Sequence, residues 1–123
     1  MSGMKTTSVF MAMLLVAGQA AAASNCVEPS APAIPEGSTA SMEEMVEAQT
    51  AVKTYQAAMS NYRVCLENHM DNLKAAMQAG DSSVSPDYMG TNASFNLSVS
   101  KEEKVAEEFN IAIRSYKAAN PSE

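Results

Sequence analysis

The sequence of 123 residues contains no tryptophan, only two cysteines and a single histidine, His69. Any Ser-His-Asp or Cys-His mechanism would therefore have to use that one histidine. No glycine-rich phosphate loop and no C-x-x-C, H-E-x-x-H or G-x-S-x-G motif occurs in the chain. Because titratable groups are scarce and these motifs are missing, we expect no enzyme, no cofactor and no small-molecule substrate.

Positive charge is also scarce. The chain contains 8 lysine and arginine residues and 14 aspartate and glutamate residues, which gives a net charge of −6. Neutralising phosphates supplies most of the affinity of nucleic-acid-binding proteins, so this composition argues against a nucleic-acid partner. The chain also lacks the lysine and arginine cluster that would hold it on anionic lipid.

The first 23 residues have the three parts of a secretory signal peptide. Lys5 is a lone positive charge, residues 9–16 are an uncharged apolar run, and residues 20–23 are four alanines. We predict cleavage after Ala23, which leaves one domain of about 100 residues. A membrane anchor is the alternative, but spanning a bilayer takes ~20 apolar residues. A lipid anchor on Cys26 would require a small residue in place of Asn25, so we expect no stable membrane anchor.

The two cysteines, Cys26 and Cys65, predict a disulfide, because an exported chain meets an oxidising compartment and the count is even. Two free thiols or an intermolecular bridge are the alternatives. Residues 24–40 contain Pro29, Pro32 and Pro35 and are expected to form an extended strut. At ~3.1 Å per residue, fourteen steps reach ~43 Å.

A long helix is predicted over residues 41–79. Ser-Met-Glu-Glu at its start matches the S-x-x-E capping box, and Gly80 follows as a stop. Cys65 then lies ~36 Å from the cap at 1.5 Å per residue, which is within the reach of the strut. The predicted disulfide would pin the strut antiparallel to this helix.

One face of this helix carries apolar residues at alternating spacings of three and four, as in a coiled coil. These residues are Met45, Ala48, Val52, Tyr55, Met59, Tyr62, Leu66, His69, Leu73 and Ala76. We interpret Met45, Val52, Tyr55, Met59 and Tyr62 as a candidate interaction surface, if the strut leaves them uncovered.

Residues 80–99 are rich in serine and asparagine, which predicts an irregular loop. Apolar residues alternate with polar ones near the end of this stretch, which indicates a short extended piece. These apolar residues are Ala93, Phe95, Leu97 and Val99. A second capping box begins at Ser100 and predicts a shorter helix over 101–118, followed by a tail over 119–123. The fold class expected is an all-α antiparallel helical hairpin.

Residues 26–66 contain three patterns in succession: C-x-x-P-x-x-P-x-I-P-x-G, S-x-E-E-M and V-K-x-Y-x-x-A-x-x-x-Y-x-x-C-L. In these patterns the chain resembles small exported proteobacterial proteins of unknown function. The terminal F-N-x-x-I-R-x-Y-K over residues 109–117 fits the same pattern. The resemblance implies a non-enzymatic helical protein in the periplasm of a Gram-negative bacterium. It implies no particular activity.

Two functions remain open. The first is a binding or structural role through the methionine and tyrosine seam, either as a homodimer or by chaperone-like contact with apolar segments of other proteins. The second is copper or other soft-metal binding, since thioethers bind Cu(I). His69 and Met70, with Met77 one heptad further on, would then be the ligands, although methionine at this spacing is also an ordinary packing residue.

Overall fold

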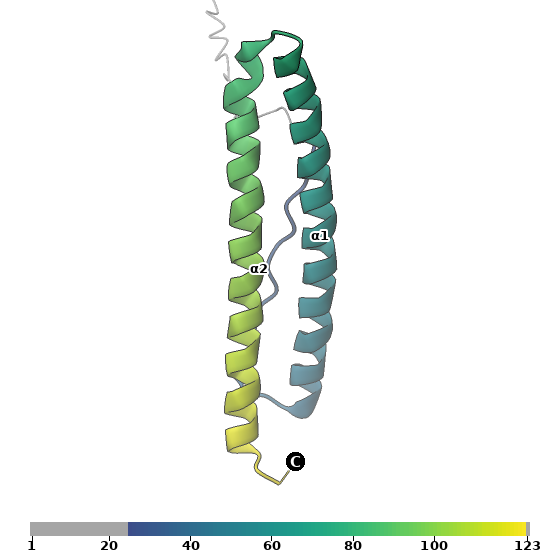
Figure 1. Ribbon diagram of the computed structural model, residues 1–123. Coiled ribbons are helices and arrows are strands. Elements are labelled where there is room, and N and C mark those ends of the chain that lie inside the picture. The colour runs from purple at the N-terminus through teal and green to yellow at the C-terminus, as the bar shows by residue number, and fades with distance from the viewer. Residues whose placement is uncertain (1–24, 123) are drawn as a thin grey trace, which may run out of the picture.

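The computed structural model of the protein describes residues 25–122. The predicted signal peptide lies outside the described residues. Two long helices make up most of the described chain: α1 spans Met42–Gln78 and α2 spans Ser85–Ala119. They run antiparallel along their whole lengths and form an all-helical hairpin, so the start of α1 and the end of α2 lie at the same end (Figure 1).

Both ends of α1 form as the sequence predicts. Ser41 is the N-cap, and its hydroxyl accepts a hydrogen bond from the Glu44 amide while the Glu44 carboxylate accepts one from the Ser41 amide. At the other end, Gly80 has a φ of 101°, a left-handed conformation that glycine adopts without steric cost. The amides of Gly80 and Asp81 donate to the carbonyls of Met77 and Ala76 and close a Schellman motif.

The connection between the helices is short. A single turn of 3-10 helix, η1 (Ser82–Val84), follows Gly80, and the Asp81 carboxylate caps it by accepting from the Ser83 amide. Pro86 then lies in the first turn of α2, where a missing amide hydrogen costs nothing. The chain therefore reverses direction within a few residues.

The prediction of an irregular loop over residues 80–99 is wrong for residues 85–99, which are helical, and the extended piece expected near Phe95 is part of α2. The second helix begins at Ser85 rather than at residue 101, so the capping box at Ser100 is not used. The hydroxyl of Ser100 instead contacts the Asn96 carbonyl within the helix. As a result α2, at 35 residues, nearly matches the 37 residues of α1.

Tertiary packing explains why this polar segment is helical. The buried residues Thr91, Ser98, Val105 and Ala112 are spaced seven apart on α2 and face the core. The hydroxyl of Thr91 donates to the Asp87 carbonyl and that of Ser98 to the Phe95 carbonyl, so neither is buried without a partner. Packing along the full hairpin outweighs the weak helix propensity of serine, threonine and glycine.

Residues 25–40 contain no helix or strand. They start beside α1, where Cys26 is bonded to Cys65, and pass along the two helices to a turn at residues 37–39 beside the start of α1 (Figure 1). We call residues 25–40 the N-terminal segment. In that turn the amides of Thr39 and Ala40 both donate to the Glu36 carbonyl.

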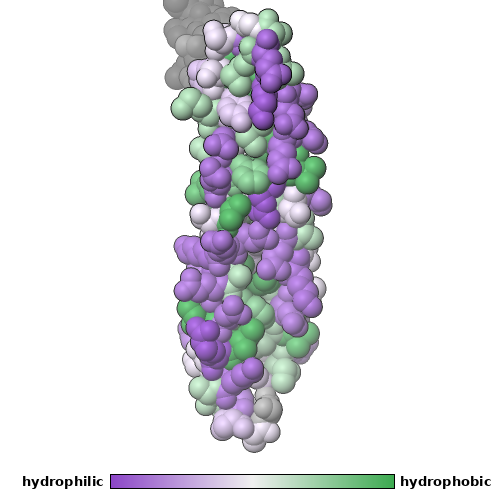
Figure 2. All heavy atoms as spheres, viewed as in Figure 1, coloured by the Kyte–Doolittle hydropathy of each residue, from purple (hydrophilic) through white to green (hydrophobic). Residues whose placement is uncertain are grey.

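Polar side chains dominate the visible face of the molecule (Figure 2). On the face seen in Figure 2, hydrophilic side chains occupy most of the area and hydrophobic ones show as separate patches. Among residues 25–122, neither helix is apolar enough over a sufficient length to cross a bilayer.

Candidate functional site

The N-terminal segment lies over a groove between α1 and α2. At its base are the buried side chains of Val52, Tyr55 and Met59 from α1 and Val105 from α2. Ile34 of the segment packs onto this cluster, with Tyr62 and Phe109 at its borders. We call this apolar region the covered groove.

A second cluster continues the core toward the open end of the hairpin. Met45 of α1 packs there with Ala112 and Tyr116 of α2. Ile34 contacts this cluster as well, so one side chain of the N-terminal segment joins both parts of the core. Fully burying a side chain of this size contributes roughly 1.5–3 kcal/mol, and the half-buried Ile34 contributes less than that.

The structure places the predicted interaction surface inside the molecule. Met45, Val52, Tyr55 and Met59 are buried against α2 and the N-terminal segment, and Tyr62 is half-buried. The four buried residues are therefore covered in the folded chain, and their role as an interaction surface stays a prediction. The physical reason for their burial is that the N-terminal segment, through Ile34, and residues 105–116 of α2 pack together over this face.

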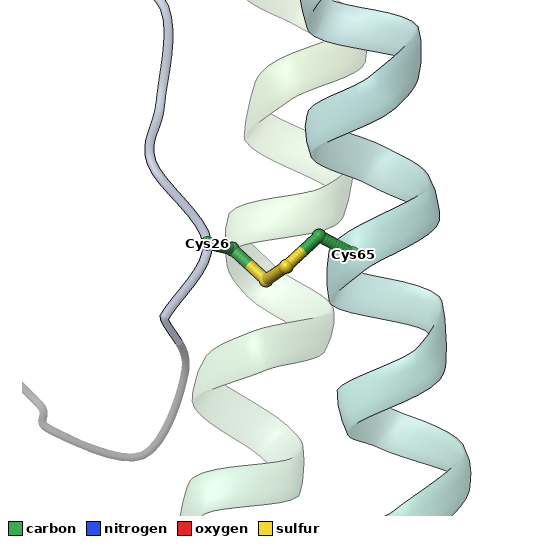
Figure 3. Close-up of a disulfide and its surroundings, with 2 residues drawn as sticks. All are labelled: Cys26 and Cys65. Atoms are coloured by element: carbon green, nitrogen blue, oxygen red, sulfur yellow. A yellow bond between two sulfur atoms is a disulfide. The ribbon is translucent and has the colours of Figure 1, made fainter.

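The disulfide fixes the far end of the N-terminal segment to α1. Cys26 and Cys65 are bonded, with their α-carbons 5.6 Å apart, and they are 39 positions apart in the sequence (Figure 3). Neither cysteine of the chain is free. The predicted pairing is thereby confirmed.

Charged residues surround the covered groove. Glu28 of the N-terminal segment pairs with Lys101 of α2, and Arg63 of α1 pairs with Glu102 of α2 at 2.7 Å. The hydrogen bond from Lys101 to Glu28 raises the pKa of the Lys101 ammonium. Burial, followed by the negative charge of Glu28, raises the pKa of the Tyr55 phenol above its usual value.

The N-terminal segment fills its groove incompletely. A hollow of about 370 Å³ lies beside it against α1, lined by Ile34, Pro35 and Ala51 among others. Another of about 230 Å³ lies against α2, lined by Gly37, Ile111 and Ala112 among others. Both hollows are open to solvent, so apolar side chains at the edges of the segment are accessible from the surface.

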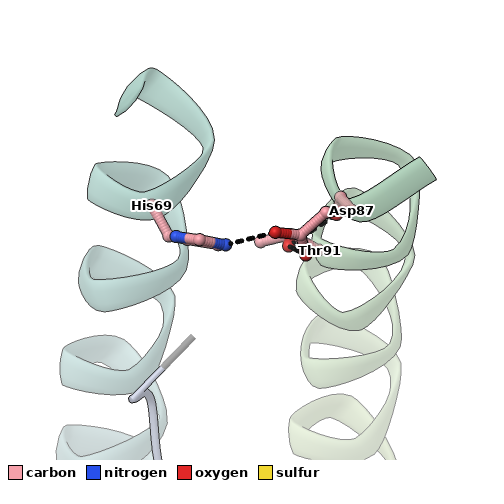
Figure 4. Close-up of polar contacts among 3 residues, drawn as sticks. All are labelled: His69, Asp87 and Thr91. Atoms are coloured by element: carbon pink, nitrogen blue, oxygen red, sulfur yellow. Dashed lines mark hydrogen bonds and ion pairs between the residues drawn. The ribbon is translucent and has the colours of Figure 1, made fainter. Parts of the chain in front are cut away.

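The one histidine joins the two helices. His69 Nε2 lies 3.1 Å from the Asp87 carboxylate, and Thr91 one turn further along α2 also contacts Asp87 (Figure 4). His69 thus has a partner within the fold.

Met70 and Met77, the other candidate copper ligands, are half-buried. No group of three or more histidine, cysteine, aspartate or glutamate residues gathers at one place within residues 25–122. Copper binding by His69, Met70 and Met77 stays a prediction.

Three features of this site were not predicted from the sequence: the pairing of Glu28 with Lys101, the pairing of Arg63 with Glu102, and the fit of Gly37 against α2. All three depend on the position of α2. The seven-residue spacing of Thr91, Ser98, Val105 and Ala112, together with Pro86 in a first turn, is the sequence pattern that indicates where this helix begins.

Comparisons with protein-family models, with curated proteins and with solved structures give no match to this chain.

Proposed function

We propose that this chain is a non-enzymatic binding protein of the periplasm, which makes chaperone-like contacts with apolar segments of other proteins through the covered groove. The observation that carries the proposal is that a tethered, non-helical segment closes this groove. The disulfide and the predicted signal peptide support an oxidising compartment outside the cytoplasm. The site offers apolar area and no set of groups suited to catalysis.

The N-terminal segment resembles the kind of chain that such a groove would accept. It is extended, it contains several prolines, and Ile34 is its main apolar contact with the helices. An extended segment of another protein, with a branched apolar side chain in the place of Ile34, would make equivalent contacts. The groove is therefore suited to chains that expose short apolar stretches, as unfolded proteins do.

The disulfide decides whether the groove is covered. The ion pair between Glu28 and Lys101 is partly exposed, and pairs of that kind contribute little to stability. A disulfide that closes a loop of this length contributes about 4 kcal/mol in the chain-entropy treatment. Opening the bond between Cys26 and Cys65 would leave the segment held by the contacts of Ile34 and by its junction with α1, so its N-terminal part could lift from the groove.

The test compares the oxidised protein with the Cys26→Ser variant in suppressing the aggregation of a thermally unfolding reporter enzyme. We expect the variant to suppress aggregation at lower concentration than the oxidised protein. Adding Ala51→Asp to the variant places a charge in the hollow beside the segment and should abolish the effect. Ala57→Asp, an exposed position on the same helix, is the matched control and should leave it intact.

Circular dichroism must show that the helices persist in each variant. If the folded Cys26→Ser variant suppresses aggregation no better than the oxidised protein, the groove is ordinary core and the proposal is wrong. A concentration-dependent dimer of that variant without any effect on the reporter would also contradict it, because self-association would then occupy the groove.

A further inference from the structure

A separate pocket lies at the open end of the hairpin, between the start of α1 and the end of α2. Its volume is about 260 Å³. Met42, Met45 and Val46 of α1 and Phe109 and Ile113 of α2 form most of its wall. The N-terminal segment does not line this pocket, so ligand binding there is independent of the proposed function of the covered groove.

The wall of this pocket is unusually apolar for a surface feature. Met42 and Val46 are 52% and 53% exposed although they lie one helical turn apart on the same side of α1. Met42 is unbranched and flexible, so it can adjust to differently shaped apolar molecules. An apolar ligand in this pocket would remove both side chains from water, at roughly 25 cal/mol for each Å² buried.

One charged residue, Lys117, lines the pocket. Its ammonium forms no ion pair with any residue between 25 and 122. Asn120 contributes a polar side chain nearby, and its amide donates to the Tyr116 carbonyl. An apolar wall with a single positive charge, unpaired among the described residues, matches a molecule that has an apolar body and one anionic group.

We propose that this pocket binds a small anionic amphiphile, namely a medium-chain carboxylate. The alkyl chain lies on Met42, Val46 and Ile113, and the carboxylate faces the Lys117 ammonium. The volume is slightly below the ~300 Å³ at which ligand pockets usually begin, which favours a short chain over a long one. Lys117 sets the preference for a negative charge, and the apolar wall supplies most of the affinity.

The test uses decanoate and its uncharged counterpart, decanol, with the full exported chain, followed by amide chemical shifts. Decanoate should shift amides of residues 42–49 and 109–120 at concentrations below its micelle range. Lys117→Gln should weaken decanoate binding by up to about fivefold, the range of an exposed ion pair, and leave decanol binding unchanged. Lys104→Gln, which alters a lysine outside this pocket, is the matched control and should change neither.

A second variant keeps the test independent of charge. Val46→Ser removes half-exposed apolar surface without touching the buried core, so it should weaken both probes. The proposal is overturned if decanoate causes no shifts up to its micelle concentration, or if the shifts fall outside the two helix ends. It is likewise overturned if Lys117→Gln and Lys104→Gln weaken decanoate equally, because a diffuse charge effect would then explain the binding.

Discussion

Gly37 lies so close to Ala112 that a β-carbon on Gly37 would be 1.9 Å from the Ala112 carbonyl oxygen. No side chain fits at that distance, and the obstacle is backbone rather than a flexible side chain. This contact brings the turn of the N-terminal segment against α2, just before the chain enters α1. The segment can follow its path over the groove only because residue 37 is glycine.

Gly37→Ala is therefore expected to lower the free energy of unfolding by about 2 kcal/mol or more, the upper part of the range for overpacking a well-packed site. The segment and α2 would have to separate to admit the methyl group. Urea denaturation followed by circular dichroism measures the change. Gly90→Ala is the control: it lies on the exposed side of α2 with no atom near its β-carbon, and it should raise stability by about 0.5–1 kcal/mol. Equal effects of the two substitutions would mean that the contact with Ala112 is not formed.

Loss of the disulfide should lower thermal stability. We expect Cys65→Ser to reduce the free energy of unfolding by up to about 4 kcal/mol, because the open chain regains the entropy of a loop that spans 39 positions. Differential scanning calorimetry of the exported protein against this variant gives the difference. An unchanged midpoint would mean that the covalent attachment contributes nothing to the fold.

The ion pair between Arg63 and Glu102 should matter more than the pair between Lys104 and Glu108. The first is mostly buried, with side chains 18% and 22% exposed, while the second is 76% and 48% exposed. Arg63 Nη1 is already buried without a hydrogen bond, so removing the Glu102 charge leaves the guanidinium still less satisfied. Glu102→Gln is expected to cost about 1.5–3 kcal/mol.

The exposed pair supplies the control for that measurement. Glu108→Gln should change the free energy of unfolding by about 0.5 kcal/mol or less, since i,i+4 pairs on a helix surface are weak. Chemical denaturation at one ionic strength compares the two variants directly. If Glu102→Gln is as mild as Glu108→Gln, burial does not strengthen the pair between Arg63 and Glu102.

Alkaline pH should destabilise the protein. The pKa of the Tyr55 phenol is raised by burial and by Glu28, and the pKa of Lys101 is raised by its hydrogen bond to Glu28. Each group contributes stability in full below its usual pKa, 10.0 for tyrosine and 10.5 for lysine, and that contribution is lost as the pH rises through the folded-state pKa. Thermal midpoints should stay level from pH 8 to about 9.5 and fall above about pH 10, and Tyr55→Phe should flatten that fall. If the thermal midpoint of Tyr55→Phe falls with pH as steeply as that of the wild type, Tyr55 does not contribute to the pH dependence of stability.

Much of the fold follows from local patterns in the sequence. The capping box at Ser41 and the stop at Gly80 are short-range features, so the limits of α1 could be predicted from neighbouring residues alone. The disulfide followed from the cysteine count and from the reach of an extended chain. Both inferences needed no knowledge of how the helices pack.

The start of α2 could not be predicted in the same way. Residues 85–100 have weak helix propensity, and the pattern at Ser100 is typical of a helix start, so local rules favoured a loop. The decisive interactions are long-range contacts of Thr91 and Ser98 with the interior of the hairpin. The burial of Val52 and Tyr55 also depends on long-range contacts, because Ile34 of the N-terminal segment packs over them beside α2.

The proposed function requires that the N-terminal segment covers the groove only while the disulfide holds it. Photo-crosslinking from a photoreactive residue at Ala51, which lines the hollow beside the segment, tests this directly in the purified protein. With the disulfide intact, the label should attach to residues 31–36 of the same chain. After reduction, in the presence of an unfolded test protein, it should attach to that protein instead. Labelling confined to residues 31–36 in both states would contradict the proposed function.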